Sequence, residues 1–151
     1  MQTVRTNLSN NASTQYTNFN YNSLCRFNGV TIGAGAAGLF KACCGPDDSG
    51  TPIAAYFTPV MTNLGIDAKK SLRYVYLGYQ AAGEVALHVT GDEKVTAGPY
   101  IFRTNPAEGQ QRRRVSIGRG MTWAYGALKI SNIAGCDFSI DSIQVQAQKG
   151  R

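Results

Sequence analysis

The sequence predicts an all-β protein, an antiparallel β-sandwich of jelly-roll type with an extended N-terminal arm. Three observations predict this fold. Apolar and polar residues alternate with a period of two in several short segments, turn-forming residues separate these segments, and no window keeps a helical period beyond a turn or two. Short strands with turns about every 8–12 residues are typical of sandwiches and jelly rolls.

Composition limits the function classes. The chain has 151 residues, long enough for one domain with a real core, and its 16% of charged residues is low for a globular protein. A net charge of +6 allows phosphate contact without requiring it. No apolar run suits a secretory signal or a membrane span, so we expect assembly in a cytoplasm and no membrane partner. The four cysteines are not spaced as zinc ligands, and we expect them to be reduced.

The first 22 residues differ in composition from the rest of the chain. They are rich in Asn, Thr, Ser and Gln, so residues 1–22 are predicted as an extended arm and residues 23–151 as the sandwich domain. Such a polar arm cannot bury enough apolar area to offset its ordering entropy. We therefore expect the arm, with Tyr16 and Phe19, to be held by a neighbouring subunit; a tuck against its own domain is the alternative.

The segment GAGAAG (residues 33–38) has the glycine spacing GxGxxG of dinucleotide-binding loops. A dinucleotide site also needs a helix after the glycines and an acidic residue after the next strand. Here Pro46 ends the candidate helix early, and no acid stands at the second place. We therefore predict a hairpin, with residues 27–32 and 39–43 as strands and the three glycines freeing the backbone at the bend, and no cofactor.

The strand that contains the only histidine shows the alternation most clearly. Val85, Leu87 and Val89 fall on one face, and the residues between them, including His88, fall on the other. This predicts a strand with one buried face and a solvent-facing His88.

The segment RYVYLGY (residues 73–79) is apolar on both faces. One face would carry Val75, Leu77 and Tyr79, and the other would carry Tyr74 and Tyr76. Such a strand is central in its sheet, or presents an aromatic face to a partner.

Two further segments are predicted as strands near the C-terminus. Residues 122–131 are rich in β-formers, and a turn at residues 133–137 follows. Alternation then resumes at Phe138 but changes phase, which predicts a bulge near Asp141 and Ser142.

The sequence shows no convincing catalytic or metal-binding constellation. A single histidine has no partner at nucleophile or ligand spacing, and Asp137 and Asp141 flank a strand rather than forming the loop cage that calcium prefers. We expect no enzyme activity and no metal.

The segment QQRRRVSIGRG (residues 110–120) is the densest positive patch. Strand alternation sends Arg112 and Arg114 to one face and Arg113 to the other. An interface with acidic protein neighbours, or a solvated face, is the favoured interpretation, and weak nucleic-acid contact is the alternative. The candidate interface residues are Arg112, Arg113, Arg114, Arg119, Tyr74, Tyr76, Tyr16 and Phe19.

A resemblance to a known family is carried by three segments. They are FNGVTIGAGAAGLFKA, LRYVYLGYQAAGEVALHVTGDE and QQRRRVSIGRGMTWAYGALKISNIAGCDFSIDSIQV. Over residues 24–146 the chain resembles small tail and head–tail connector proteins of tailed bacteriophages. The resemblance implies a virion component built on a β-sandwich, present in several copies and in contact with other virion proteins. It assigns no functional site.

Three hypotheses follow for function. The first is a structural subunit of a phage particle that acts by assembly and is located in the virion. The second is a glycan-binding module on a tail fibre, for which Trp123, Tyr125, Tyr74 and Tyr76 are candidate sugar platforms. The third, a cofactor enzyme using the glycine segment, is the least favoured.

Overall fold

The computed structural model describes residues 3–9, 11, 13–16, 19–42, 45, 47–48, 50–60, 62–92, 95–118 and 122–149. Within these ranges the regular structure is strands, apart from one 3-10 turn at Pro106–Glu108. Contacts divide the chain into an N-terminal unit, Met1–Gly45, and a C-terminal unit, Pro46–Arg151. No described helix is long and apolar enough to cross a membrane.

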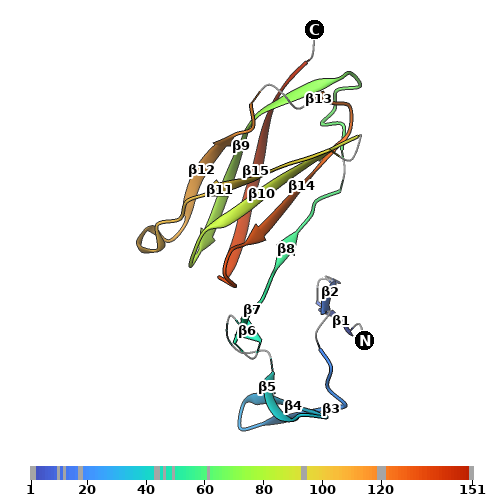
Figure 1. The fold of residues 1–151 in the computed structure, drawn as a ribbon, viewed down its shortest axis with the longest axis vertical. Helices are drawn as coiled ribbons and strands as arrows, with labels where there is room; N and C mark the ends of the chain where they lie inside the picture. The colour runs from blue at the N-terminus through green and yellow to red at the C-terminus, as the bar shows by residue number, and fades with distance from the viewer. Residues whose placement is uncertain are drawn as a thin grey trace. The chain divides into compact units, whose positions relative to one another are not determined.

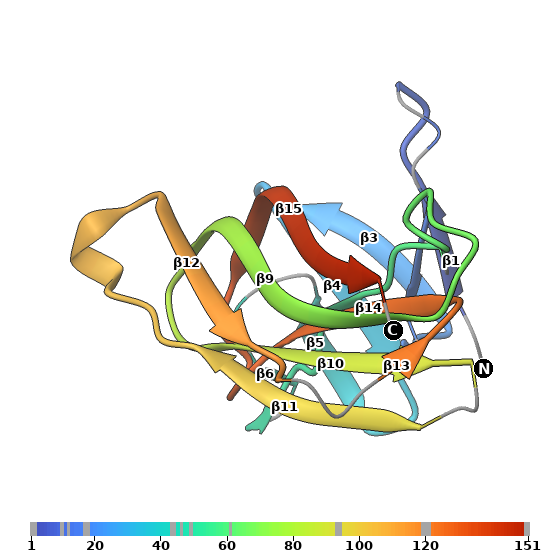
Figure 2. The same cartoon turned by 90° about the horizontal axis from the view of Figure 1, so that it is seen from above.

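The C-terminal unit is a sandwich of two antiparallel sheets, which confirms the predicted fold class (Figure 1). One sheet has the order β11 (Thr96–Phe102), β10 (Val85–Gly91), β14 (Gly126–Asn132) and β8 (Tyr56–Phe57). The other sheet has β9 (Lys70–Ala81) at its centre. β15 (Phe138–Lys149) pairs with one side of β9, and β12 (Gln111–Ser116) and the short β13 (Thr122–Trp123) pair with the other side. Figure 2 shows these two layers facing each other.

The core lies between the two sheets and comes from the alternating residues. β9 and β10 both contribute side chains with no exposed surface. They are Leu72, Val75, Leu77 and Tyr79 from β9, and Val85, Leu87 and Val89 from β10. Burying one such side chain stabilises the fold by about 1.5–3 kcal/mol. The predicted inward faces of both strands are therefore confirmed, as is the central position of β9.

The predicted bulge in the last strand is also confirmed. The register of β15 against β9 shifts between Ile140 and Ser142, which leaves Asp141 as the extra residue. Because of this insertion, Ile140 and Ile143 both face the core although they are three residues apart.

The strand predicted over residues 122–131 is divided into β13 and β14. The break falls at Ala124 and Tyr125, whose backbone N–H groups both donate to the carboxylate of Asp92. Backbone groups bound to a side chain are not available for a sheet ladder, so the chain turns here.

The N-terminal unit contains two small antiparallel sheets. β1 (Thr3–Thr6) pairs with β2 (Ser13–Tyr16), so the segment predicted as an extended arm forms a hairpin. β3 (Ser23–Phe27), β4 (Val30–Gly35) and β5 (Gly38–Ala42) form a three-stranded sheet. The change in composition after residue 22 predicts these three strands as part of the sandwich, whereas their contacts group them with the arm. The short pair β6 (Asp47–Asp48) and β7 (Thr51–Pro52) begins the C-terminal unit.

The glycine segment forms the predicted hairpin, with β4 and β5 paired from Thr31 to Ala42 and a strand, not a helix, after Gly38. The role predicted for Gly33 is wrong. Gly33 lies within β4, not at the bend, and a Cβ there would come within 2.5 Å of the Tyr21 ring. Its missing side chain makes room for an aromatic ring.

A turn that the sequence analysis did not identify joins β3 to β4. Asn28 and Gly29 both have positive φ, 47° and 79°. This is the two-residue Asn-Gly turn that matches the twist of paired strands, so residues 27–32 belong to two strands rather than one.

Candidate functional site

The outer face of the β12–β9–β15 sheet brings four of the predicted interface residues together. Residues that face each other on antiparallel strands point to the same side of a sheet. Arg114 lies opposite Tyr76, which lies opposite Gln144 on the far strand; Tyr74 lies opposite Gln146. We call the surface formed by Tyr74, Tyr76, Arg112, Arg114, Gln144 and Gln146 the Arg–Tyr–Gln face.

Cation–π contacts organise this face. The guanidinium carbon of Arg112 lies 5.6 Å from the centre of the Tyr76 ring, and that of Arg114 lies 5.0 Å from the Tyr74 ring. Arg112 also donates a hydrogen bond to Oε1 of Gln144. The arginines and glutamines are exposed while the rings beneath are half-buried, so the face presents amides and guanidinium groups to solvent.

Further polar pairs border the Arg–Tyr–Gln face on β15. Arg73 donates from Nε and from one terminal nitrogen to Oε1 of Gln148, at 3.0 and 2.6 Å. The carboxylate of Asp141 accepts from the side chain of Gln110 at 2.9 Å. Among these groups three arginines face one carboxylate, so this side of the sheet is positively charged.

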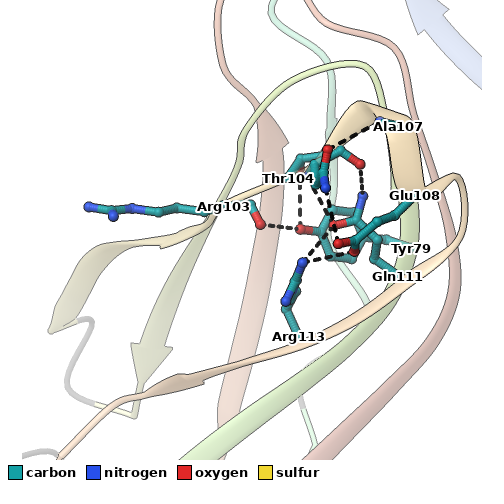
Figure 3. A network of polar contacts seen from close by, with 8 residues as sticks. Tyr79, Arg103, Thr104, Ala107, Glu108, Gln111 and Arg113 are labelled. Atoms are coloured by element: carbon teal, nitrogen blue, oxygen red, sulfur yellow. Dashed lines mark hydrogen bonds and ion pairs between the residues drawn. The ribbon is translucent and has the colours of Figure 1, made fainter.

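Arg113 points away from the Arg–Tyr–Gln face, toward the loop between β11 and β12 (Figure 3). It forms an ion pair with Glu108 at 2.9 Å. Asn105 holds Glu108 from the other side at 3.0 Å, and its Oδ1 accepts the backbone N–H of Ala107. Arg113 therefore fixes a turn of its own chain.

The same network reaches the core through Gln111 and Tyr79. Gln111 is buried, and its side chain both accepts from the backbone N–H of Asn105 and donates to the Asn105 carbonyl. The Tyr79 hydroxyl donates to the Arg103 carbonyl and accepts from Thr104. These bonds satisfy buried polar atoms where the chain crosses between the sheets, so their role is structural.

A hollow of about 460 Å³ lies beside this loop. It is lined by Ile101, Phe102, Arg103, Thr104, Asn105, Arg113 and Arg114. In Figure 3 the Arg103 side chain points away from the polar network. The hollow thus carries positive charge next to the edge of β12.

A buried cation closes the opposite end of the sandwich. Lys70 has no exposed surface, and its Nζ donates to the carbonyls of Ile66, Ala68 and Ala124 at 2.8, 3.2 and 2.5 Å. The same ammonium lies 5.5 Å from the centre of the Trp123 ring. A buried charge is tolerated when its hydrogen bonds are satisfied in this way.

Trp123 does not form the sugar platform considered from the sequence. Only 2% of its surface is exposed, and a Cβ at Gly126 would come within 2.3 Å of its ring. Tyr125, in contrast, is 53% exposed. Of the aromatic residues proposed for a glycan platform, the tyrosines alone reach the surface.

In the N-terminal unit, Tyr16 and Phe19 belong to an aromatic row. The ring centres of Tyr16 and Phe19 are 5.4 Å apart, those of Phe19 and Tyr21 are 4.8 Å apart, and Tyr21 continues to Phe40. These contacts, with Tyr21 packed on Gly33, cover part of one face of the three-stranded sheet, on which Leu24 remains 51% exposed.

The other face of that small sheet is mostly apolar, and its residues on the two outer strands are exposed. Six apolar residues of this face, Cys25, Phe27, Val30, Ile32, Ala34 and Leu39, form what we call the N-terminal apolar face, and the register places Ser23 and Lys41 on the same side. Phe27 is 71% exposed and Leu39 is 77% exposed. Sheet faces of this composition are normally covered.

The remaining residues singled out by the sequence do not form a site in the described part of the chain. No described group of three His, Cys, Asp or Glu side chains is placed to hold a metal. His88 is half-buried rather than solvent-facing, because β10 has neighbours on both sides, and its Nδ1 has no hydrogen-bond partner among the described atoms. Arg119 lies outside the described residues.

Comparison with models of known families, with curated proteins and with solved structures finds no match to this chain. The function is therefore inferred from the geometry of the chain itself. Sequence reasoning missed Lys70, Asp92 and the glutamines of β15. The alternation Ile143, Gln144, Val145, Gln146 could have placed those glutamines beside the tyrosines, whereas nothing local marks Lys70 as buried.

Proposed function

We propose that this chain is a structural subunit of a bacteriophage virion, located in the tail or the head–tail region, and that it acts by assembling with copies of itself and other virion proteins. The observation that carries the proposal is the N-terminal apolar face. The described strands of the N-terminal unit leave Phe27 and Leu39 mostly exposed, and contact with another subunit would bury them.

Size supports the same interpretation. The N-terminal unit spans 45 residues, close to the length at which a chain needs a disulfide, a metal or a partner to be stable. Its described cysteine, Cys25, is free, and no described metal-binding group is present. Contact with another subunit would supply such stabilisation.

The resemblance of residues 24–146 to phage tail and connector proteins supplies the kind of assembly. It agrees with an all-β chain that joins two compact units, one of which has an open apolar sheet face. Subunits of a closed ring or tube bury such faces against neighbouring copies.

The first test is mass spectrometry of purified particles from the phage that encodes the chain, which should contain the protein in multiple copies. A second test changes the N-terminal apolar face. Phe27→Gln with Leu39→Gln should block incorporation, because it places two amides where apolar contact is needed.

Leu8→Gln is the matched control, because Leu8 is 91% exposed but lies in the β1–β2 turn and not on the sheet. Fluorescence of the buried Trp123 checks that the sandwich stays folded in every variant. Particles without the chain, or normal incorporation of the double variant, would refute the proposal.

A further inference from the structure

We propose that the Arg–Tyr–Gln face binds an acidic polysaccharide, that is, a glycan chain whose sugars carry carboxylates. This binding activity goes beyond the assembly role and does not depend on it. The face belongs to the sandwich, whereas the assembly argument rests on the N-terminal unit.

The first step is the charge of the surface. Arg112 and Arg114 are exposed on the face and Arg73 lies at its border, and among the described residues Asp141 is the one acidic side chain in the contacts around it. A guanidinium group can form two parallel hydrogen bonds to a carboxylate. Arg73 contributes mainly its charge, because its Nε and one terminal nitrogen already donate to Gln148. A ligand with regularly spaced carboxylates therefore complements this surface better than a neutral one.

The second step is hydrogen bonding to hydroxyl groups. Gln144 and Gln146 are exposed beside the tyrosines, and Ser142 continues the same row. Amide and hydroxyl groups both donate and accept, so they match sugar hydroxyls. A surface built for phosphate alone would need donors only.

The third step separates a glycan from single-stranded nucleic acid. Nucleic-acid bases bind to open aromatic rings by stacking. Here Arg112 lies over Tyr76 and Arg114 lies over Tyr74, so both rings already have a cation above them. The face thus lacks the open platforms that bases require.

The fourth step is the size of the surface. The strands of a sheet lie about 4.8 Å apart, so three strands give a face about 10 Å wide, and six residues of β9 extend it by about 20 Å. The register from Tyr74 to Tyr79 pairs without interruption with β12. This is a continuous surface on which a few linked sugar rings can lie.

The test measures binding of the full chain to three immobilised or labelled probes: polygalacturonate, neutral dextran and an oligothymidylate. Polygalacturonate should bind and the other two should bind much more weakly. Added salt should weaken the binding, because exposed charges are screened.

Arg112→Ala with Arg114→Ala should lower the affinity for polygalacturonate by about tenfold or more, the loss expected when charge-assisted hydrogen bonds are removed. Arg113→Ala is the matched control, since it removes the same charge from the same strand but from the opposite face. It should change the affinity by less than about twofold, because its side chain points away from the face. The loss of its exposed ion pair should cost little stability.

Four results would overturn the proposal. They are the absence of polygalacturonate binding, equal binding of dextran, equal or tighter binding of the oligothymidylate, and an equal loss with Arg113→Ala. Light scattering adds a fifth: if the double variant dissociates an oligomer of the wild type, the face is a contact between copies. None of these results bears on whether particles contain the chain, so the two proposals fail separately.

Discussion

Two charged side chains hold the ends of the sandwich strands at the level of single residues. Lys70 binds carbonyls from the loop before β9 and from the β13–β14 turn, and Asp92 binds two N–H groups of that turn. The turn is therefore held from both sides, its carbonyl by a cation and its amides by an anion. Neither residue belongs to the Arg–Tyr–Gln face, so both can be changed without touching the proposed binding surface.

Replacing Lys70 with methionine should lower the free energy of unfolding by about 2–4 kcal/mol, because it leaves buried carbonyl oxygens without a donor. Urea denaturation followed by circular dichroism measures the change. Lys69→Met is the control, since Lys69 is the exposed neighbour of Lys70. Equal effects of the two substitutions would show that the carbonyl contacts contribute nothing.

Asp92 makes the stability depend on pH. The backbone N–H groups of Ala124 and Tyr125 hold the pKa of the Asp92 carboxyl below its ordinary value of 3.8. A carboxyl whose pKa is lowered on folding stabilises the protein above its unfolded pKa, and the stabilisation is lost as pH falls through the folded pKa.

Asp92→Asn should therefore be less stable than wild type near neutral pH, and the difference should shrink as the pH falls below 3.8. Urea midpoints of both proteins across this range measure it, and other carboxyls cancel in the comparison. A difference that stays constant over the range would contradict the role given to the carboxylate.

At the level of strands, alternation carries most of the information. It predicted the buried faces of β9 and β10 and the bulge at Asp141, because each of these follows from neighbouring residues. It did not predict the break between β13 and β14, since that depends on Asp92, 32 positions from Ala124. Nor did it predict the role of Gly33, which is set by a ring outside its own strand.

The candidate surface shows the same limit. Alternation correctly separated Arg112 and Arg114 from Arg113, but the partner of Arg113 lies in the loop before its strand. The contribution of Gln144 required knowing that β15, and not another strand, lies beside β9. Pairing between distant strands is a property of tertiary packing and leaves no local pattern.

The bulge in β15 gives a test at this level. Deleting Asp141 should cost less than about 1 kcal/mol, because Ile140 and Ile143 would then lie two positions apart and both would still face the core. Deleting Gln144 should unfold the domain or cost several times more, since it turns Val145 outward.

Thermal or urea unfolding of the two deletion variants provides the measurement. Both remove one polar, exposed residue from the same strand, so they differ only in what they do to the register. Similar losses for the two deletions would mean that the bulge is not what keeps the core residues in phase.

At the level of the whole molecule, two units divide the proposed tasks. The sandwich buries its own core and carries the Arg–Tyr–Gln face, while the N-terminal unit carries an apolar face that lacks cover from its own strands. The sequence placed the boundary after residue 22, where composition changes. Contacts place it at Gly45, because the strands of residues 23–42 pair with one another.

If the boundary at Gly45 separates two folding units, substitutions in one should not destabilise the other. Leu77→Ala in the buried core of β9 should lower the free energy of unfolding of the sandwich by about 2–5 kcal/mol. The change is measured as a lower urea midpoint of Trp123 fluorescence. Gly33→Ala forces a Cβ against the Tyr21 ring in the N-terminal unit, yet should leave the Trp123 midpoint unchanged.

Hydrogen exchange of the β4 amides measures the stability of the N-terminal unit. Gly33→Ala should increase the exchange rate of these amides, and Leu77→Ala should not. In the double variant the two effects should add, because distant sites without shared contacts are independent. A shift of the Trp123 midpoint by Gly33→Ala would instead mean that the units fold as one. The open N-terminal face would then have to be explained by packing within the chain rather than by a neighbouring subunit.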